Sequence, residues 1–372
     1  MSRFARHSRV HFFEEPVYEN QSPELRRSIC PRTGVHVITP VLPVGTSPGQ
    51  IVMLQRQMLE SMLVDDDIHD FIAWYYTPMA LQFTNAIPSS LTIYDCMDEL
   101  SAFAGAPPTM RANEQLLFER ADLVFTGGAS LFAAKRKNHS SVHLFPSSVD
   151  VTHFSRARSL TGELADQTNI PHPRIGYIGV IDERLDTTLL IRIAEMNPSW
   201  HFVMVGPVVK IDPKTLPKCT NIHYLGMKAY DDLPDYLGSW DVAILPFSLN
   251  ESTRFISPTK TPEYLAAGLP VVSTPIADVI APYGDLGLVS IAAGAERFTE
   301  AIAHALKHGR TRSWSKQVDA FLDILSWDRT WQKMAELINQ RQTTKDSLLT
   351  GVPLSTTQGA WIPAMGLEKS NV

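Results

Sequence analysis

Short runs of β-branched and aromatic residues alternate along the chain with stretches whose apolar residues recur at helical spacing. Ile51, Leu54, Met58 and Met62 show the second pattern, falling three or four positions apart. Parallel strands need crossover connections, which are usually helices, so this alternation is typical of parallel sheets covered by helices. The pattern predicts a protein of the α/β class.

The apolar runs predict strands in both halves of the chain. In the first half they fall at Val10–Phe13, Val35–Ile38, Phe71–Tyr75, Leu91–Asp95, Leu123–Thr126 and Val142–Phe145. In the second half they fall at Ile175–Ile181, Phe202–Val205, Ile222–Leu225, Val242–Leu245 and Val271–Ser273. Helices are expected at 51–62, 111–120, 187–196, 231–238 and 259–267.

One segment interrupts the alternation and predicts a domain boundary. Residues 151–173 contain Gly, Asn and Pro after the last strand of the first half, which is typical of a linker. We therefore expect a first domain over 1–160 and a second over 161–340. Residues 341–372 have no periodicity and many Ser, Thr, Gly and Pro residues, so they are predicted to be a disordered tail.

The composition excludes several classes of protein. Hydrophobic residues make up 44% and charged residues 19% of the 372, which excludes a fibrous or wholly disordered chain. The net charge of −6 gives no basic footprint for nucleic acid. Cys30, Cys96 and Cys219 are far apart, which argues for reduced thiols in the cytoplasm and against structural zinc. The long uncharged run at 34–55 is broken by prolines, so no membrane span is predicted.

The segment SPTKTPEYLAAGLPVVST at 257–274 carries the clearest chemistry. Ser257 or Thr259 can cap a helix whose N-terminus points out of the carboxyl edge of a parallel sheet, where such folds bind ligands. Helix N-termini favour phosphate, and Lys260 adds a full positive charge there. Glu263 lies three residues later on the same helix face, within reach of ribose hydroxyls.

A second cation, Arg184, follows the strand RIGYIGVI and would meet the same cleft. Together these residues predict a site for a nucleotide diphosphate. The alternative is ordinary surface chemistry, in which Lys260 and Glu263 form a plain helical ion pair.

The order of these motifs resembles the C-terminal domain of GT-B glycosyltransferases of the family 4, or group 1, type. The resemblance rests on Gly179 in its strand, Arg184, and then the segments VMVGP, HYLGM, DVAILPF and PTKTPEYLAAGLPVV. It covers residues 174–274 closely. It extends loosely to PSSVD at 146–150 and SWDRTW at 326–331.

The resemblance implies two Rossmann-like domains that face each other across a cleft, with the donor nucleotide bound by the second and the acceptor by the first. Arg184 and Lys260 would neutralise the donor diphosphate, and Glu263 would bind the ribose. The backbone around Gly206 and Met227 would hold the base, and Gly179 would also belong to the donor site. The nucleotide sugar is a co-substrate, and neither a metal nor another cofactor is expected.

One departure from the family pattern concerns the donor sugar. The family often has a second glutamate eight residues before the ribose glutamate, where this chain has Phe255. Asn250, Glu251 and Thr253 lie nearby in the loop LNESTRF, so we expect sugar recognition to be redistributed among them.

The first domain offers candidate acceptor residues in YDCMDELSAF at 94–103. Asp95, Asp98 and Glu99 follow a strand and should face the cleft, where they could orient acceptor hydroxyls or supply a general base. Asp98 is the preferred candidate, because Asp95 at a strand end is also well placed to cap the next helix. Trp74, Tyr75 and Tyr76 could stack on a sugar ring, although aromatic residues in a buried strand are more often core.

Two further clusters have structural explanations. His139 and His143 have a spacing that metal ligands use, but they flank a strand without nearby carboxylates, which favours a structural role. Lys135, Arg136 and Lys137 end a helix, where cations complement the dipole, and a basic patch facing a membrane is the second interpretation.

The start of the chain departs from the family. Related sequences begin with a strand before the helix that leads into a segment like SRFARHSRVHFFEEP, and Met1 falls inside that helix. The resemblance therefore implies that the first domain lacks its first strand.

These observations predict a cytoplasmic glycosyltransferase that moves a sugar from a nucleotide-diphosphate sugar to a saccharide or lipid-linked acceptor, with peripheral contact to the inner face of a bacterial membrane. The surface-polysaccharide context follows from the resemblance alone. The alternatives are a non-catalytic nucleotide-binding partner of such a system, and a nucleotide-sugar epimerase on the same fold. No nucleic-acid partner is expected.

Overall fold

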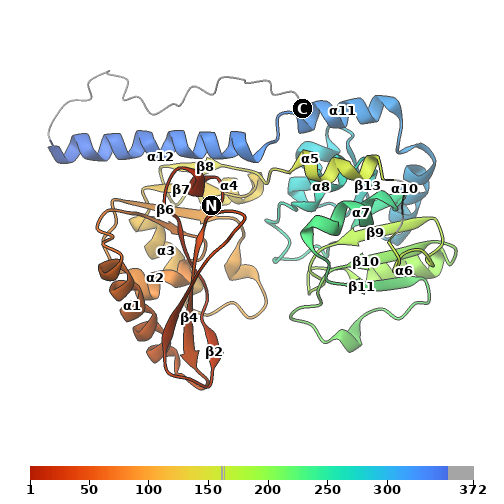
Figure 1. Cartoon of the computed structure of the whole chain (residues 1–372). Coiled ribbons are helices and arrows are strands. Elements are labelled where there is room, and N and C mark those ends of the chain that lie inside the picture. The colour runs from red at the N-terminus through yellow and green to blue at the C-terminus, as the bar shows by residue number, and fades with distance from the viewer. Residues whose placement is uncertain (161, 163, 351–372) are drawn as a thin grey trace, which may run out of the picture.

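The chain folds into two α/β domains that lie side by side (Figure 1). The structure is a computed structural model and describes residues 1–160, 162 and 164–350. The final helix α12 (Trp327–Thr350) begins near the second domain and runs back over the first. Among the described helices, none combines the length and the apolar character that crossing a membrane requires.

The first domain contains two separate sheets. In one, β4 (His36–Pro43) pairs in parallel with β1 (His11–Phe13) and β2 (Val17–Glu19), and antiparallel with β3 (Glu24–Ile29). The other is parallel throughout, in the order β5-β6-β7-β8. Its strands are β5 (Ile72–Tyr75), β6 (Leu91–Cys96), β7 (Leu123–Thr126) and β8 (Val142–Leu144).

Helices connect these strands. The longest in this domain apart from α12 is α1 (Pro48–Asp65), where the Ser47 and Gln50 side chains form a reciprocal cap that satisfies free N–H groups. The others are α2 (Leu81–Thr84), α3 (Met110–Arg120) and α4 (Ala129–Lys135), with short helical turns η1 (Phe4–Arg6), η2 (Pro78–Ala80) and η3 (Leu100–Ala102).

The second domain is built on one continuous parallel sheet in the order β11-β10-β9-β12-β13-β14. Its strands are β9 (Arg174–Ile178), β10 (His201–Val205), β11 (Ile222–Gly226), β12 (Val242–Leu245), β13 (Val271–Ser273) and β14 (Val289–Ile291). Every residue of β9, β12 and β13 is buried, as expected for strands covered on both faces.

The helices of the second domain cover this sheet (Figure 1). They are α5 (Val151–Ser155), α6 (Thr187–Met196), α7 (Leu233–Gly238), α8 (Lys260–Ala266), α9 (Ala277–Val279), α10 (Ala295–His308) and α11 (Arg312–Leu322). Short helical turns are η4 (Arg156–Arg158), η5 (Pro213–Thr215), η6 (Tyr230–Asp232) and η7 (Ile280–Gly284).

The predicted boundary at residue 160 is too late. Val149, Phe154 and Ala157 are buried in the hydrophobic core of the second domain, so α5 and η4 belong to it. In the opposite direction, α12 starts inside the range predicted for the second domain but buries Ile338 in a core cluster of the first. The chain therefore crosses between the domains twice.

The predicted tail also begins too early, because residues 341–350 continue α12. The helix is held on the first domain by charge: Arg341 and Lys345 lie 3.4 and 3.0 Å from the carboxylate of Asp122, whose side chain is only 12% exposed. These contacts hold the last turns of α12 against the first domain. Residues 351–372 lie outside the described residues.

Most predicted strands and helices are confirmed to within a few residues, and α6, β7, β12 and β13 have the predicted bounds. The sequence pattern missed β2, β3 and β14. In β3 every residue except Leu25 is exposed, so the strand has no buried face to produce an alternating pattern.

Candidate functional site

The carboxyl ends of β9 and β10 bring two glycines into backbone contact. Gly179 follows β9 and Gly206 follows β10, and both have positive φ angles, 148° and 144°. A Cβ atom on Gly206 would lie 1.9 Å from the carbonyl oxygen of Gly179, so only glycine fits there. The two loops can therefore stack closely at the edge of the sheet.

The same packing leaves room for Lys260 at the start of α8. A Cβ atom on Gly179 would lie 2.0 Å from Cε of Lys260, so the lysine side chain passes directly over the glycine. Its Nζ lies 5.9 Å from the ring centroid of Tyr177. Burial lowers the pKa of Lys260, while the nearby Glu263 acts in the opposite direction. A bound anion would favour the charged form of this amine.

A hydrogen bond fixes α8 against β9. The backbone N–H of Ile178 donates to the hydroxyl of Tyr264 at 2.7 Å, and Tyr264 is fully buried. One turn into the helix, Glu263 is half-buried beside Lys260, and burial raises the pKa of its carboxyl to about 7. At neutral pH this carboxyl is poised between its two protonation states.

Arg184 is oriented by a buried carboxylate. Its Nε and Nη2 donate to the two oxygens of Asp182 at 3.0 and 2.6 Å, and its backbone N–H donates to the same side chain. These hydrogen bonds raise the pKa of Arg184. The side chain of Asp182 is 6% exposed, whereas that of Arg184 is 26% exposed, so the guanidinium is held at the surface by a fixed partner.

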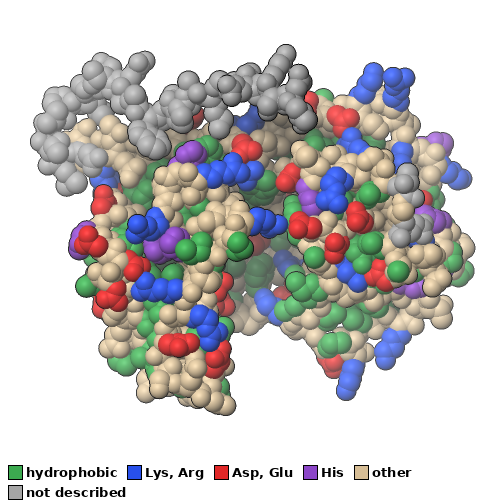
Figure 2. All heavy atoms as spheres, in the orientation of Figure 1, with side chains coloured by type: hydrophobic (Ala, Val, Ile, Leu, Met, Phe, Trp, Pro, Cys, Tyr) green, Lys and Arg blue, Asp and Glu red, His purple; other side chains and the backbone are tan. Residues whose placement is uncertain are grey.

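The first domain contributes Asp98 to the same place. Burial raises the pKa of Asp98, and the positive charges of Arg184 and Lys260 oppose that shift. Asp98, which lies more than 80 positions before Arg184 and Lys260 in the sequence, is therefore close enough to them for their charges to affect its pKa across the domain interface. Figure 2 shows a hollow between the two lobes, with lysine and arginine side chains in view inside it.

Further contacts join the two lobes around this site. The ring of Phe103, from the loop after Asp98, lies 5.4 Å from both the Arg184 guanidinium and the Lys210 ammonium of the second domain. Phe255, which replaces the family's second glutamate, packs against a hydrophobic cluster of the first domain. At this position the chain has an interdomain contact in place of a carboxylate.

The remaining predicted donor residues differ in exposure and in hydrogen bonding. Met227 is 76% exposed. Asn250 is exposed, but its Oδ1 accepts hydrogen bonds from the backbone of Ser252 and Thr253, and the Thr253 hydroxyl donates to the carbonyl of Ser248. The side-chain oxygens of Asn250 and Thr253, which were expected to bind the sugar, therefore form hydrogen bonds within the loop.

The predicted cap residues of α8 do not cap it. Thr259 precedes the helix with helical backbone angles and makes no side-chain cap. Ser257 packs against the first domain, because a Cβ atom on Gly128 would lie 2.8 Å from its Cβ. Next to it, Asp278 accepts a hydrogen bond from the backbone N–H of Ser130 at 2.9 Å, which links the domains at the start of α4.

Other candidates have structural roles. Lys135, predicted to complement a helix end, is buried and forms ion pairs of 2.7 Å with Glu99 and Glu114, which also removes Glu99 from the acceptor candidates. Asp95 accepts a hydrogen bond from the indole of Trp74 and does not cap a helix. Burial raises the pKa of Asp95 to about 6.

The histidine pair has the structural role that was expected. His139 bonds to the carbonyl of Ala121 and accepts from the N–H of Ser141, whose hydroxyl meets His143. Within the described ranges, no group of three or more His, Cys, Asp or Glu side chains is arranged to hold a metal ion.

Sequence reasoning missed Asp182, Phe103, Lys210 and Asp278. Asp182 had a usable signal, because a carboxylate two residues before a functional arginine can orient it. The other three act across the domain interface, and their partners are distant in sequence.

Comparison with known proteins gives the family of the second domain. Residues 172–308 match the family model described as glycosyl transferases group 1. That range contains Gly179, Arg184, Lys260 and Glu263. The second domain is a group 1 glycosyltransferase domain.

A relative matches beyond this domain alone. A protein of Bacillus subtilis (strain 168) named for a teichuronic acid biosynthesis glycosyltransferase, TuaH, is 26% identical over 225 residues. The match covers 54% of this chain and 54% of the relative, so it spans about half the length of each.

Solved structures that are similar to most of the chain show its fold. Sucrose-phosphate synthase from Thermosynechococcus elongatus superposes with a TM-score of 0.69 at 15% identity, covering 91% of this chain and 90% of that one. HepE of Anabaena, solved in complex with UDP and glucose, superposes with a TM-score of 0.64 at 15% identity, covering 83% of this chain and 87% of that one. The glycosyltransferase WaaG superposes with a TM-score of 0.59 at 14% identity, covering 90% of this chain and 92% of that one. The chain has the GT-B architecture, as predicted.

Proposed function

We propose that this protein transfers a sugar from a nucleotide-diphosphate sugar to a saccharide or lipid-linked acceptor in the synthesis of a bacterial surface polysaccharide. The observation that carries the proposal is the placing of two cations at one edge of the second domain, where Asp182 holds Arg184 and the Lys260 side chain passes over Gly179. The positive charges of Arg184 and Lys260 also act on the pKa of Asp98 in the first domain. The match to group 1 glycosyltransferases and the likeness to HepE, whose structure contains UDP and glucose, support a nucleotide-sugar donor. The relative named for teichuronic acid biosynthesis supports the polysaccharide context.

In the proposed reaction, the bond between the anomeric carbon and the diphosphate oxygen breaks, and an acceptor oxygen bonds to that carbon. Negative charge develops on the leaving diphosphate, where Arg184 and Lys260 stabilise it. The acceptor hydroxyl donates a hydrogen bond to Asp98, which takes up its proton. Because Asp182 fixes Arg184 beforehand, little reorganisation is needed as the charge appears.

The donor would lie along the edge formed by β9, β10 and α8. The carboxylate of Glu263 accepts hydrogen bonds from the ribose hydroxyls, and the backbone near Gly206 and Met227 contacts the base. Asn250 and Thr253 position the loop beside the sugar. In this proposal the side chains alone bind the donor and stabilise the leaving group, and no metal ion is assigned a role. We place the reaction in the cytoplasm, with peripheral contact to the inner membrane face where a lipid-linked acceptor would lie.

Glu263→Gln tests the proposed nucleotide site. A neutral amide accepts hydroxyl hydrogen bonds less strongly than a carboxylate, so we expect UDP or GDP affinity to fall about tenfold, while inorganic pyrophosphate affinity stays unchanged. Isothermal titration calorimetry with the three ligands measures both effects. Equal losses for pyrophosphate and the nucleotide would show that Glu263 supports the loop and does not contact the ribose.

The same residue predicts a pH dependence. Burial raises the pKa of Glu263 to about 7, and ribose hydroxyls stabilise its charged form, so binding favours the deprotonated carboxyl. UDP-glucose affinity should therefore rise as the pH increases from 6 to about 8 and then level off. The rise should be absent in Glu263→Gln. If affinity rose with pH by the same amount in Glu263→Gln, the pH dependence would belong to another titratable group.

Gly179→Ala tests the packing under Lys260. The added Cβ would lie 2.0 Å from Cε of Lys260, so the lysine must move, and we expect UDP affinity to fall at least about tenfold. Gly287→Ala is the matched control, because Gly287 also has a positive φ, 69°, but open space around it. Both variants place an alanine at a positive φ, and calorimetry should find the loss of affinity in Gly179→Ala alone. Similar losses in both would remove the steric explanation.

A further inference from the structure

A buried network of charges adjoins the segment that carries Asp98. Lys135, the last residue of α4, has a side chain that is only 6% exposed. Its Nζ donates to both oxygens of Glu114 on α3, at 2.8 and 2.7 Å, and lies 2.7 Å from Oε2 of Glu99. Glu99 directly follows Asp98 in the chain. One lysine therefore joins the segment after β6 to two helices of the first domain.

Each carboxylate oxygen of this network has a partner. Oε1 of Glu99 accepts a hydrogen bond from the hydroxyl of Ser101 at 2.7 Å, and Glu114 accepts another from the hydroxyl of Tyr94 at 2.8 Å. The three N–H groups of Lys135 are matched by the remaining contacts to three carboxylate oxygens. A buried polar network that is satisfied in this way specifies one arrangement of the elements that it joins.

Stability alone is a poor explanation for burying these charges. Lys135 faces two carboxylates, so the network keeps a net negative charge largely away from water. Replacing buried ions by apolar side chains of similar size is often neutral or stabilising. A demand on geometry explains the network better, and that demand falls on the segment that begins at Glu99.

The chain is also fixed on the other side of Asp98. The carbonyl of Cys96 accepts a hydrogen bond from the N–H of Gly127 at 3.0 Å. A Cβ atom on Gly127 would lie 2.8 Å from the carbonyl oxygen of Met97, so the two backbones are in direct contact. The thiol of Cys96 donates to the carbonyl of Asp98 at 3.6 Å. Asp98 therefore lies in a short span that is held at both ends.

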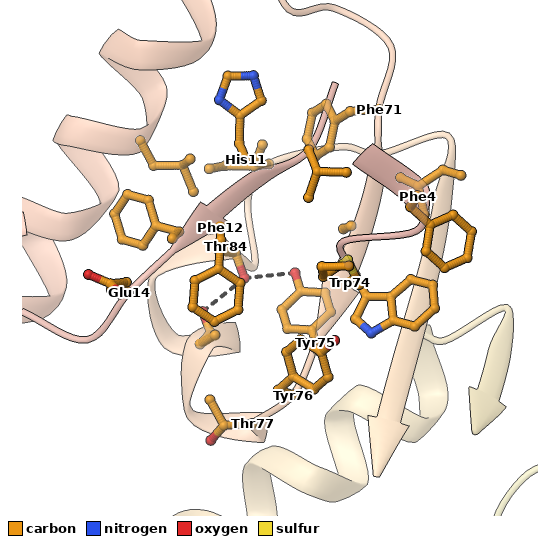
Figure 3. A pocket seen from close by; sticks show the side chains of 18 of the residues that line it. Phe4, His11, Phe12, Glu14, Phe71, Trp74, Tyr75, Tyr76, Thr77 and Thr84 are labelled. Atoms are coloured by element: carbon orange, nitrogen blue, oxygen red, sulfur yellow. Dashed lines mark hydrogen bonds between the residues drawn. The ribbon is translucent and has the colours of Figure 1, made fainter. Parts of the chain in front are cut away.

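The three carboxylates of this segment differ in their partners. Asp95 accepts a hydrogen bond from the indole of Trp74 at 3.1 Å, and Figure 3 shows Trp74 at the wall of an aromatic pocket in the first domain. Glu99 belongs to the buried network. The half-buried side chain of Asp98 forms no hydrogen bond or ion pair with another residue that the structure describes. Of the three, Asp98 is the carboxylate left to meet a ligand.

We propose that Lys135 is a positioning residue for the transfer reaction, which through Glu99 holds Asp98 where the acceptor hydroxyl gives up its proton. This inference rests on the proposed function, because it takes the role assigned there to Asp98. Since Lys135 is buried, it touches neither donor nor acceptor. It keeps Asp98 in place before the acceptor arrives, and a misplacement of about 1 Å at a reacting group can cost about 100-fold in rate.

Lys135→Met tests this role by steady-state kinetics. The change removes the charge that holds Glu99, so we expect kcat for sugar transfer to fall about 100-fold, while UDP affinity measured by calorimetry stays within about twofold. Asp122→Asn is the matched control, because it weakens a partly buried set of ion pairs near the start of β6, at the end of the strand away from Asp98. It should lower the melting temperature without a selective loss of kcat. Similar losses of kcat in both variants would reduce Lys135 to a structural residue.

The Asp98→Asn background separates positioning from general damage. If Lys135 acts through Asp98, Lys135→Met should reduce kcat no further once that carboxylate is gone. Two losses that multiply would show that Lys135 acts by another route, and the proposal would be wrong. Glu99→Gln serves if Lys135→Met does not fold, because it leaves the pair with Glu114 intact. We expect it to lower kcat about tenfold, again only while Asp98 is present.

Hydrogen exchange measured by mass spectrometry gives a readout that needs no activity. Peptides covering residues 97–103 should exchange at least about tenfold faster in Lys135→Met than in the wild type, and peptides covering 257–266 at an unchanged rate. Unchanged exchange at 97–103 would overturn the positioning role. An active wild type whose kcat survives Lys135→Met would overturn that role and leave the proposed function intact. A wild-type protein that transfers no sugar would overturn the proposed function itself.

Discussion

Lys260→Ala is expected to reduce kcat/KM for sugar transfer by about 100-fold or more. The ammonium lies at the edge of the sheet where the leaving diphosphate would develop charge, and removing one such stabilising group commonly costs a factor of about 10²–10³. Part of the loss should appear in binding, since one charge-assisted contact is worth about 1 to 3 kcal/mol. UDP affinity measured by calorimetry and steady-state kinetics separate the two contributions.

The matched control is Lys307→Ala, which removes an exposed lysine from α10 of the same domain. Arg184→Ala should behave like Lys260→Ala in binding, because the cleft again loses one cation. If neither variant changed nucleotide affinity, Lys260 and Glu263 would be an ordinary ion pair and the diphosphate would bind elsewhere.

Asp98→Asn should reduce turnover by a factor of about 10² to 10⁴ without weakening donor binding, since this is the usual contribution of a positioned general base. Asp98 opposes the positive charge of Arg184 and Lys260 in the free protein, so its neutralisation leaves more charge for the anionic donor. We therefore expect UDP affinity to stay the same or increase slightly.

Asp65→Asn, at an exposed position near the end of α1, is the control for loss of one carboxylate from the first domain. A parallel fall in turnover and UDP affinity in Asp98→Asn would place Asp98 among the donor-binding residues. Unchanged turnover would remove it from the acceptor site.

The sequence was sufficient to predict what short-range patterns determine. Continuous apolar runs locate β7, β12 and β13, because a strand buried on both faces must be apolar along its whole length. The strand β3 could not be found in this way, because its side chains are mostly exposed and its stability comes from pairing with β4. The sequence pattern also missed the helix over residues 341–350, where Arg341 and Lys345 contact Asp122, more than 200 positions away.

The candidate site likewise contains residues that the sequence could predict and residues that it could not. Lys260, Glu263 and Arg184 lie at the ends of recognisable elements, so their motif predicts a common cleft. Asp182, two residues before Arg184, could have been assigned from the sequence as its partner, whereas Phe103 could not be assigned without the structure. Phe103 comes from the other domain, and its place beside Arg184 depends on how the lobes pack.

Sugar transfer itself is the central claim, and an assay of nucleotide release tests it most directly. The protein is incubated with a panel of UDP- and GDP-sugars, with and without saccharide and lipid-linked acceptors, and Lys260→Ala is the inactive control. We predict that one donor releases its nucleotide at a rate that an acceptor increases, with the sugar recovered on that acceptor by mass spectrometry. Tight donor binding without release under any condition, or conversion of the donor sugar to its epimer without need of an acceptor, would contradict the account.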